Sequence, residues 1–355
     1  MSKQVSSLQT LAQELAFPST RYQGSKAKLV DWIWKQVSNL NFTTVLDAFG
    51  GTASVSYLFK TKAKKVAYND LLQFNYNIAL ALIQNKNTRL GSNEVDWLLQ
   101  KHSYIDYPSF IQENFSGIYF TDDENVLIDQ LITNINYLND QYKQAVAFFA
   151  LCQACIIKRP YNLFHRKNLY IRLADVKRSF GNKTSWDRPL NDWFRDFVKE
   201  ANQAIFDNGH ENIVYNMDVL AIPTNYDLVY IDPPYISRQG VVVDYLNFYH
   251  FLEGLAVYPD WKNRIDYKSK HRRFIAKTND WTDKKKVIAA FDKLFERYQH
   301  SILVVSYRND GIPSETELLD LMKKYKKSTH VECYGKYQYA LSTNTNSQEI
   351  LLIGT

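Results

Sequence analysis

The run YDLVYIDPPY at residues 226–235 places the strongest constraint on the fold of this 355-residue chain. Its apolar part, residues 228–231, has the character of a strand. Proline cannot donate to a sheet ladder, so the strand must end before Pro233 and Pro234. Asp232 therefore lies at the carboxyl end of a strand, which in open parallel α/β sheets is the edge where ligands bind. The letters DPPY alone also fit an ordinary strand that ends in a proline turn.

Other stretches repeat this pattern of a short apolar run, a turn and a helical segment. They are FTTVLDAFGG (42–51), KKVAYND (64–70) and HSILVVSYR (300–308). Strands that alternate with helices indicate βαβ units and a parallel sheet. After residue 308 the sequence predicts a helix, SETELLDLMKKYKK, and then a hairpin of two strands, VECYGKYQYALS and SQEILLIGT, joined by TNTN. The expected fold class is α/β, with a Rossmann-like, mainly parallel sheet and a C-terminal hairpin.

The alternation of strands and helices stops between about residues 91 and 208. Helical periodicity dominates residues 121–157, which open with Thr121 and Glu124 at the spacing of a capping box. We therefore expect one domain formed by residues 1–90 and 209–355, with a mostly helical domain of residues 91–208 inserted into it. A length of 355 residues agrees with about two domains.

The cysteines and histidines show no metal-ligand spacing. Cys152 and Cys155 lie within the apolar run AVAFFALCQACII, which has the composition of a buried helix, and the third cysteine is Cys333. A zinc site would require a second pair or histidines at ligand spacing. The seven histidines are scattered, and no metal is expected.

Positive charge is concentrated in one segment. Residues 151–190 hold nine lysines and arginines against two aspartates, a net charge of +7, whereas the rest of the chain sums to −1. Aromatic side chains are interleaved with these charges, as in surfaces that hold phosphates and stack bases. A solvated basic face is the alternative, but the pattern favours binding to a polyanion.

Polar groups and glycines follow each of the first strands. The glycines of DAFGGT let the backbone approach a ligand closely, although they do not form a G-x-G-x-x-G fingerprint. Asp70 lies about 20 residues beyond them, where a carboxylate accepts hydrogen bonds from ribose hydroxyls. Lys26, in the upstream run RYQGSK, has the charge to pair with a ligand carboxylate. A nucleoside that carries a carboxylate and no phosphate fits this set, and S-adenosylmethionine has that description.

These stretches, in this order, resemble the Dam-like N6-adenine DNA methyltransferases of the alpha group. YQGSK resembles the N-terminal motif of that family, DAFGGTAS its cofactor loop, AYND its ribose-binding motif and DPPY its catalytic motif. The basic run RPYNLFHRKNLYIR resembles the DNA-facing stretch of the family, and the resemblance covers nearly the whole chain. The cofactor loop departs from the family pattern: Ala53 stands where a later glycine is usual, and Gly50 is additional.

The resemblance implies a methyltransferase fold, S-adenosylmethionine as cofactor, and methyl transfer to an adenine flipped out of double-stranded DNA. The inserted domain is then the target-recognition domain. The implied catalytic residues are Asp232, Pro233, Pro234 and Tyr235. The implied cofactor-binding residues are Tyr22, Gly24, Lys26, Asp47, Phe49, Gly50, Gly51, Thr52, Asp70, Asp218, Val219 and Asp232. The implied DNA-binding residues are Arg159, Tyr161, Asn162, Arg166, Lys167, Asn168, Tyr249 and His250.

Other functions are less consistent with the motifs. Cytosine N4 methyltransferases more often carry serine where Asp232 stands, and RNA is a further substrate to consider. A binding protein without turnover would be expected to have lost Asp232, Tyr235, Lys26 or Asp70. A restriction endonuclease would require a metal-binding acidic cluster that is not evident.

We expect a cytoplasmic protein, bacterial or phage-encoded, that is associated with the nucleoid. The N-terminal residues lack the pattern of a signal peptide, and no apolar stretch approaches the ~20 residues needed to span a bilayer. A restriction endonuclease that acts on the same site is the candidate protein partner.

Overall fold

The computed structural model describes residues 15–176, 183–276, 279–336 and 347–355. The chain forms two compact units, each assembled from separate segments. The sheet unit comprises Gln23–Ala79, Asn208–Tyr245 and Ala276–Thr355. The helical unit comprises Met1–Tyr22, Leu80–Asp207 and Leu246–Ile275. The helical unit thus contains residues 91–207 of the predicted insert, together with three segments that the sequence placed in the other domain: residues 1–22, 80–90 and 246–275.

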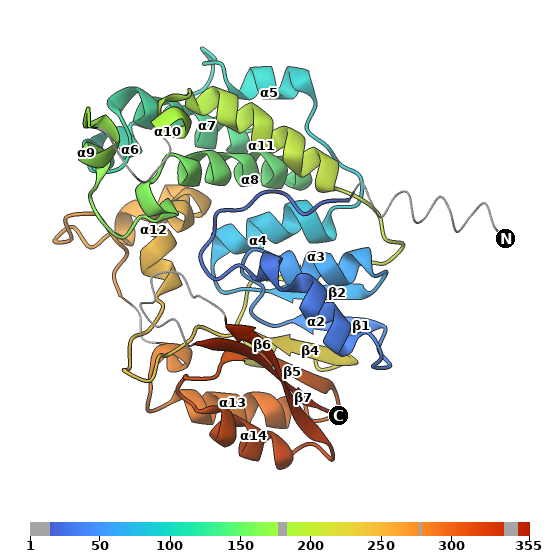
Figure 1. Ribbon diagram of the computed structural model, residues 1–355. Coiled ribbons are helices and arrows are strands. Elements are labelled where there is room, and N and C mark those ends of the chain that lie inside the picture. The colour runs from blue at the N-terminus through green and yellow to red at the C-terminus, as the bar shows by residue number, and fades with distance from the viewer. Residues whose placement is uncertain (1–14, 177–182, 277–278, 337–346) are drawn as a thin grey trace. The chain divides into compact units, whose positions relative to one another are not determined.

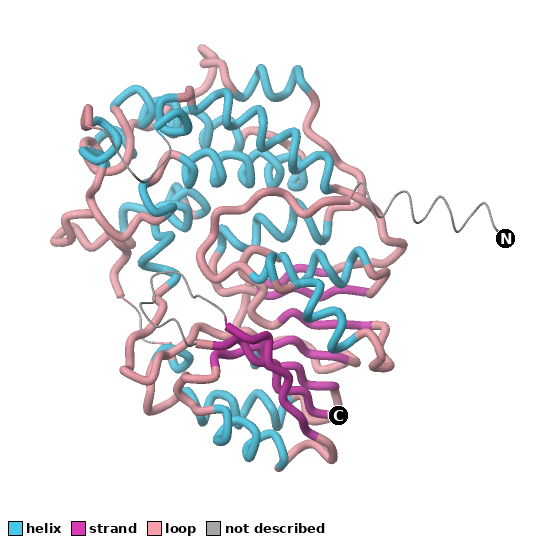
Figure 2. Tube along the Cα trace, viewed as in Figure 1, coloured by secondary structure: helices cyan, strands magenta, loops and turns pink. Residues whose placement is uncertain are grey.

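A seven-stranded sheet forms the centre of the sheet unit, in the order β3-β2-β1-β4-β5-β7-β6 (Figures 1 and 2). Strands β1 to β5 pair in parallel, and β7 pairs antiparallel with both β5 and β6. The strands are β1 (Thr44–Asp47), β2 (Lys65–Asn69), β3 (Ile213–Tyr215), β4 (Leu228–Ile231), β5 (Ile302–Arg308), β6 (Thr329–Lys336) and β7 (Gln348–Gly354). The mainly parallel α/β sheet and its antiparallel C-terminal strands are confirmed, while TNTN lies outside the described residues.

Helices cover both faces of the sheet (Figure 1). The helical elements of this unit are η1 (Lys26–Lys28), α2 (Val30–Val37), α3 (Ser54–Thr61), α4 (Gln73–Ala79), η4 (Val219–Ala221), η6 (Asp280–Thr282), α13 (Val287–Arg297) and α14 (Glu315–Lys323). Apolar side chains of α13 and α14, among them Phe291 and Leu318, pack against strand residues such as Val229 and Val305. Burial on both faces explains why β4 and the first four residues of β5 are apolar or aromatic.

The helical unit is organised around α8, which is buried on almost all sides and contains Cys152 and Cys155. The predicted capping box of Thr121 and Glu124 opens α7. The elements of this unit are η2 (Leu80–Gln84), α5 (Ser92–Leu98), α6 (Phe110–Phe115), α7 (Asp122–Asn136), α8 (Gln141–Ile157), η3 (Pro160–Asn162), α9 (Leu169–Leu173), α10 (Lys183–Asp187), α11 (Leu190–Ala204), η5 (Tyr258–Asn263) and most of α12 (Tyr245–Ala256). No helix in the described ranges is both long and apolar enough to cross a membrane.

Close packing of α12 generates a prediction. Gly254 lies against the fully buried indole of Trp261, and a Cβ atom there would come within 1.9 Å of the ring. Gly254→Ala is expected to lower the free energy of unfolding by about 1–3 kcal/mol, because overpacking outweighs the gain in helix propensity. Chemical denaturation followed by tryptophan fluorescence measures this change. Gly91→Ala is the control, since its Cβ would meet nothing nearer than 3.5 Å; equal midpoints for the two variants would contradict the packing argument.

Candidate functional site

The carboxyl ends of β1 and β4 lie next to each other in the sheet. Asp47 is paired with Tyr230, and the backbone N–H of Ala48 donates to the carbonyl of Tyr230 at 2.9 Å. The loop that follows Asp47 and the DPPY loop that begins at Asp232 therefore start at the same edge. The sequence predicted this placement from the two strand ends alone.

The loop after β1 is held in a defined shape. The N–H of Gly50 donates to the carbonyl of Asn69 at 2.8 Å, and the N–H of Gly51 donates to Asp70 Oδ2 at 3.0 Å. A Cβ atom at Gly50 would come within 2.1 Å of the Tyr68 ring, whereas one at Gly51 would meet no atom within 4 Å among the described residues. The close approach of Tyr68 explains why a glycine stands at position 50. The space beside Gly51 is not filled by described residues.

Ala53 takes the backbone conformation that a glycine would favour. Its φ of 65° and ψ of 15° lie in the left-handed region, immediately before α3 begins. Few side chains adopt this conformation without cost. Alanine thus replaces the usual glycine at position 53, but the left-handed backbone conformation of that position is kept.

The motif YQGSK approaches this loop from η1. Ser25 Oγ lies 3.2 Å from Thr52 Oγ1. Gly24 has a φ of 80°, and a Cβ atom there would collide with the Tyr245 hydroxyl. Phe49 packs edge-on against Trp281, with ring centroids 4.8 Å apart, and Trp281 was not singled out from the sequence.

Two carboxylates behind the loop are arranged differently. Asp47 accepts a hydrogen bond from Ser56 Oγ at 2.7 Å, and its Oδ1 has no hydrogen-bond partner among the described residues. Burial raises the pKa of Asp47 to about 7. Asp70 accepts from the N–H groups of Gly51 and Leu72, and burial also raises its pKa. The Asp70 side chain therefore helps to fix the shape of the loop.

Asp218 and Val219 follow β3. Asp218 is exposed and caps η4 by accepting from the N–H of Leu220 at 2.8 Å, while Val219 is buried. Capping explains Asp218 structurally, and an exposed carboxylate oxygen remains available to a ligand.

Lys26 lies between two carboxylates, one of which the sequence analysis missed. Its Nζ is 3.1 Å from Asp232 Oδ1 and 3.1 Å from Glu349 Oε1, and it contacts the Tyr235 hydroxyl. Tyr235 lies 2.7 Å from Asp232 Oδ1 and 2.8 Å from Glu349 Oε1. Lys26 thus pairs with protein carboxylates in this structure, and no ligand carboxylate is needed to balance its charge.

The DPPY residues differ in exposure. Asp232 retains 16% of its side-chain surface, whereas Tyr235 is buried and packs edge-on against Tyr307. Pro233 is buried and Pro234 half-buried. Burial raises the pKa of Asp232 to about 6, against the lowering effect of Lys26 and with a further raising effect of Glu349. Asp232 is therefore the carboxylate that a substrate can reach.

The residues at this edge fit S-adenosylmethionine. The unpartnered oxygen of Asp47 is a buried acceptor at the glycine loop, and Gly51 leaves room for close approach of a ligand. Asp70 adds a carboxylate at the end of the neighbouring strand β2. The described residues contain no group of three or more histidine, cysteine or acidic side chains placed to hold a metal ion.

Tyr22, Tyr249 and His250 belong to the helical unit. The rings of Tyr22 and Tyr249 stack at 4.3 Å. His250 is fully buried, with Nε2 2.8 Å from the Tyr119 hydroxyl and 3.1 Å from the carbonyl of Phe164. Burial lowers the pKa of His250 to about 3, so the ring is neutral at physiological pH. These contacts place His250 in the interior, and a direct phosphate contact has no support from its position.

The structure separates the predicted DNA-binding residues into two groups. Arg159 is only 1% exposed and donates to the carbonyls of Tyr119, Leu163 and Arg166 and to Asn168 Oδ1. Asn168 is also buried, so these two side chains support the segment of residues 159–168 from the interior of the unit. Tyr161 is 53% exposed and Arg166 and Lys167 are exposed, with Asn162 half-buried. Tyr161 and Asn162 both have left-handed backbones, with φ values of 63° and 58°.

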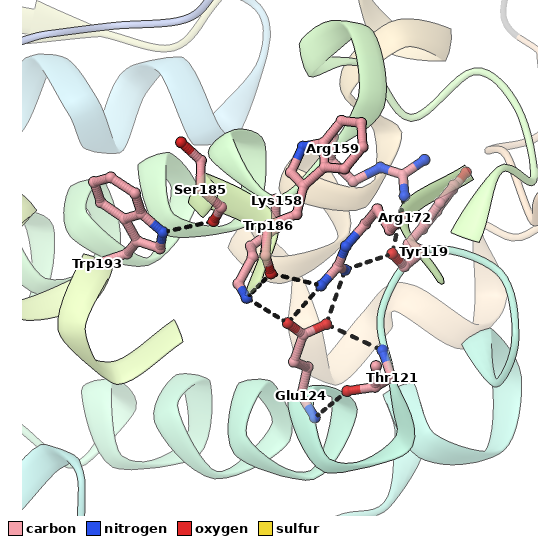
Figure 3. Close-up of polar contacts among 9 residues, drawn as sticks. All are labelled: Tyr119, Thr121, Glu124, Lys158, Arg159, Arg172, Ser185, Trp186 and Trp193. Carbon is pink, nitrogen blue, oxygen red and sulfur yellow. Dashed lines mark hydrogen bonds and ion pairs between the residues drawn. The ribbon is translucent and has the colours of Figure 1, made fainter. Parts of the chain in front are cut away.

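A buried ion cluster secures both ends of this segment (Figure 3). Glu124 receives two hydrogen bonds from the Arg172 guanidinium, at 2.7 and 2.9 Å, and lies 2.8 Å from Lys158 Nζ. The same carboxylate accepts from the N–H of Thr121 at 3.0 Å. Burial would raise the pKa of Glu124, but the hydrogen bonds and charges of Arg172 and Lys158 outweigh it and keep the pKa below its usual range. Lys177, Arg178 and Phe180 of the basic stretch lie outside the described residues.

Glu124→Gln tests this cluster. The substitution leaves two buried cations without their carboxylate, which is expected to lower the free energy of unfolding by about 3 kcal/mol. Glu94→Gln is a matched control, because Glu94 also accepts from the N–H of the residue that caps its helix, Gly91, at 2.9 Å and pairs with Lys143 at 2.6 Å. About one-third of each side chain in that pair is exposed to solvent, which screens the pair, so a much smaller loss of stability is expected. Similar denaturation midpoints for both variants would refute the role of the buried cluster.

Several known proteins are similar in sequence to this chain over most of its length. The chain is 30% identical to the type II methyltransferase M2.HphI of Haemophilus parahaemolyticus, over 95% of this chain and 97% of that protein. It is 25% identical to M.NlaIII of Neisseria lactamica, over 92% and 94% of the two chains. It is 27% identical to M.FokI of Planomicrobium okeanokoites, but spans about half the length of that protein, 47%. The model of the D12 class N6 adenine-specific DNA methyltransferases matches residues 22–310, and the chain belongs to this family.

Proposed function

We propose that Asp232 and the carbonyl of Pro233 hold the exocyclic amine of a target adenine for methylation at N6. The lone pair of this amine is delocalised into the ring, so catalysis requires acceptors that draw on its N–H bonds and fix its orientation. The observation that carries the proposal is the partial exposure of Asp232 at the carboxyl end of β4, with Lys26, Tyr235 and Glu349 buried around it. The hydroxyl of Tyr235 would then act as a hydrogen-bond donor to the carboxylates of Asp232 and Glu349.

S-adenosylmethionine is the proposed methyl donor, and when bound it supplies an electrophilic methyl group. The loop of Gly50, Gly51 and Thr52 would hold it through backbone groups, and Asp70 would accept from its ribose hydroxyls. Asp47 offers the buried acceptor oxygen described above. Asp218 and Val219 are assigned to its adenine ring, since Val219 provides buried apolar surface next to an exposed carboxylate.

The exposed side chains of η3 and of the loop that leads to α9 are the proposed DNA contacts in the helical unit, which would be the target-recognition domain. Arg166 and Lys167 supply charge for phosphates, and Tyr161 supplies a ring that can stack or wedge. Arg159 and Asn168 support the backbone of this segment and are assigned no direct contact.

A role in restriction and modification is proposed from the relatives. The names of M2.HphI and M.NlaIII describe type II methyltransferases. The methylated site would then be protected from a cognate endonuclease in the bacterial cytoplasm.

Asp232→Asn tests the catalytic assignment. The amide keeps the shape of the side chain but loses the charge, so methyl transfer is expected to fall by at least about 10²-fold while S-adenosylmethionine binding changes little. Nucleoside analysis of plasmid DNA incubated with labelled cofactor measures N6-methyladenine. In the wild type, an acceptor with a pKa of about 6 must be ionised, so the rate should decline as the pH falls through about 6. Near-normal turnover of the variant would remove Asp232 from its role.

Replacing Arg166 and Lys167 together by glutamine tests the DNA-binding assignment. Loss of two phosphate contacts should weaken DNA binding and reduce the slope of log K against log salt by about 2. Lys323→Gln with Lys324→Gln is the control, because these exposed lysines lie at the C-terminal end of α14 and their replacement removes the same charge from the sheet unit. Equal slopes for the two double variants would show that only net charge matters.

A further inference from the structure

Glu349 is a buried carboxylate to which neither the sequence motifs nor the family match assigns a role. It is fully buried at the start of β7, beyond the matched residues 22–310. Its Oε1 receives hydrogen bonds from Ser306 and Tyr235 and an ion pair from Lys26. A charge buried to this degree is costly unless it is paired, and these three contacts supply the pairing.

Strand direction explains how a residue so distant in sequence reaches the DPPY loop. β7 runs antiparallel to β5, and Glu349 is paired with Arg308 at the end of that strand. The first residues of β7 therefore lie at the same edge as the carboxyl ends of β4 and β5. A parallel final strand would have placed Glu349 at the opposite edge of the sheet.

Asp232 and Glu349 share the same two donors. Lys26 lies 3.1 Å from one oxygen of each carboxylate, and the Tyr235 hydroxyl lies 2.7 and 2.8 Å from the same two oxygens. A phenol carries a single proton and can donate it to one acceptor at a time. Tyr235 must therefore donate either to Asp232 or to Glu349. When it donates to Glu349, a lone pair of Asp232 is released.

We propose that Glu349 is a positioning residue for methyl transfer, which accepts the Tyr235 proton and shares the Lys26 charge while Asp232 binds the adenine amine. This inference rests on the proposed role of Asp232. Without the second acceptor, Tyr235 and Lys26 would both bind Asp232, and the carboxylate would be a weaker acceptor for the substrate. The partial exposure of Asp232 and the complete burial of Glu349 separate the two roles.

The charges around Asp232 also support a role for Glu349. The groups that face Asp232 are Lys26 from η1, Asp47 from β1, Tyr230 from β4, Tyr235 from its own loop and Glu349 from β7. Burial is the largest cause of the raised pKa of Asp232, Lys26 opposes it, and the negative charge of Glu349 adds to it. Removing that charge should therefore lower the pKa of Asp232.

Glu349→Gln, measured by single-turnover methylation of plasmid DNA from pH 5 to 9, tests the proposal. The amide keeps the size of the side chain, so the expected result is a rate on the pH plateau reduced about tenfold, with cofactor affinity changed less than about twofold. The acid limb of the profile should move to lower pH. Glu332→Gln on β6 is the control, because Glu332 is a half-buried carboxylate on the strand paired with β7.

Glu349→Asp is the second variant, and it covers the case in which the amide prevents folding. It keeps the charge but shortens the side chain, so the plateau rate should fall while the acid limb stays near that of the wild type. A wild-type rate and profile in either folded variant would overturn the inference. The proposed function fails separately: the wild-type protein would then form no N6-methyladenine, or Asp232→Asn would remain active.

Discussion

One buried ammonium group holds the candidate active site together. Lys26 lies between the carboxylates of Asp232 and Glu349, and two acids so close would otherwise repel each other or become protonated. This contact joins three parts of the sheet unit: η1, the DPPY loop after β4, and the start of β7. Asp232 can remain ionised and available to a substrate because the charge of Lys26 offsets those of the two carboxylates, and the proposed chemistry depends on this.

The sequence predicted the parts of the structure that depend on local patterns. Proline after an apolar run located the end of β4, and the capping box of Thr121 and Glu124 located the start of α7. The α/β class follows from the alternation of strands and helices. The prediction did not reach contacts that depend on long-range register. Glu349 meets Tyr235 across 114 positions, and only the antiparallel pairing of β7 brings them together. A charged residue within the apolar run of β7 was the available signal.

Burial of charge was the other property that composition could not reveal. The basic segment reads as a uniform positive surface, yet Lys158, Arg159 and Arg172 are buried and Arg166 and Lys167 are exposed. The buried cations serve the backbone: they bind carbonyl groups and Glu124, and so fix the loop that presents the exposed ones. Counting charges therefore overstates how many of them are available to a polyanion.

The left-handed Ala53 has a consequence for ligand binding. A glycine at this turn would leave many backbone states open to the loop, whereas alanine has fewer of them to lose when the chain becomes ordered. Hydrogen bonds from the N–H groups of Gly50 and Ala53 hold the turn in one arrangement. The conformational entropy of the loop is thus largely lost during folding, and a ligand that enters has little of it left to overcome.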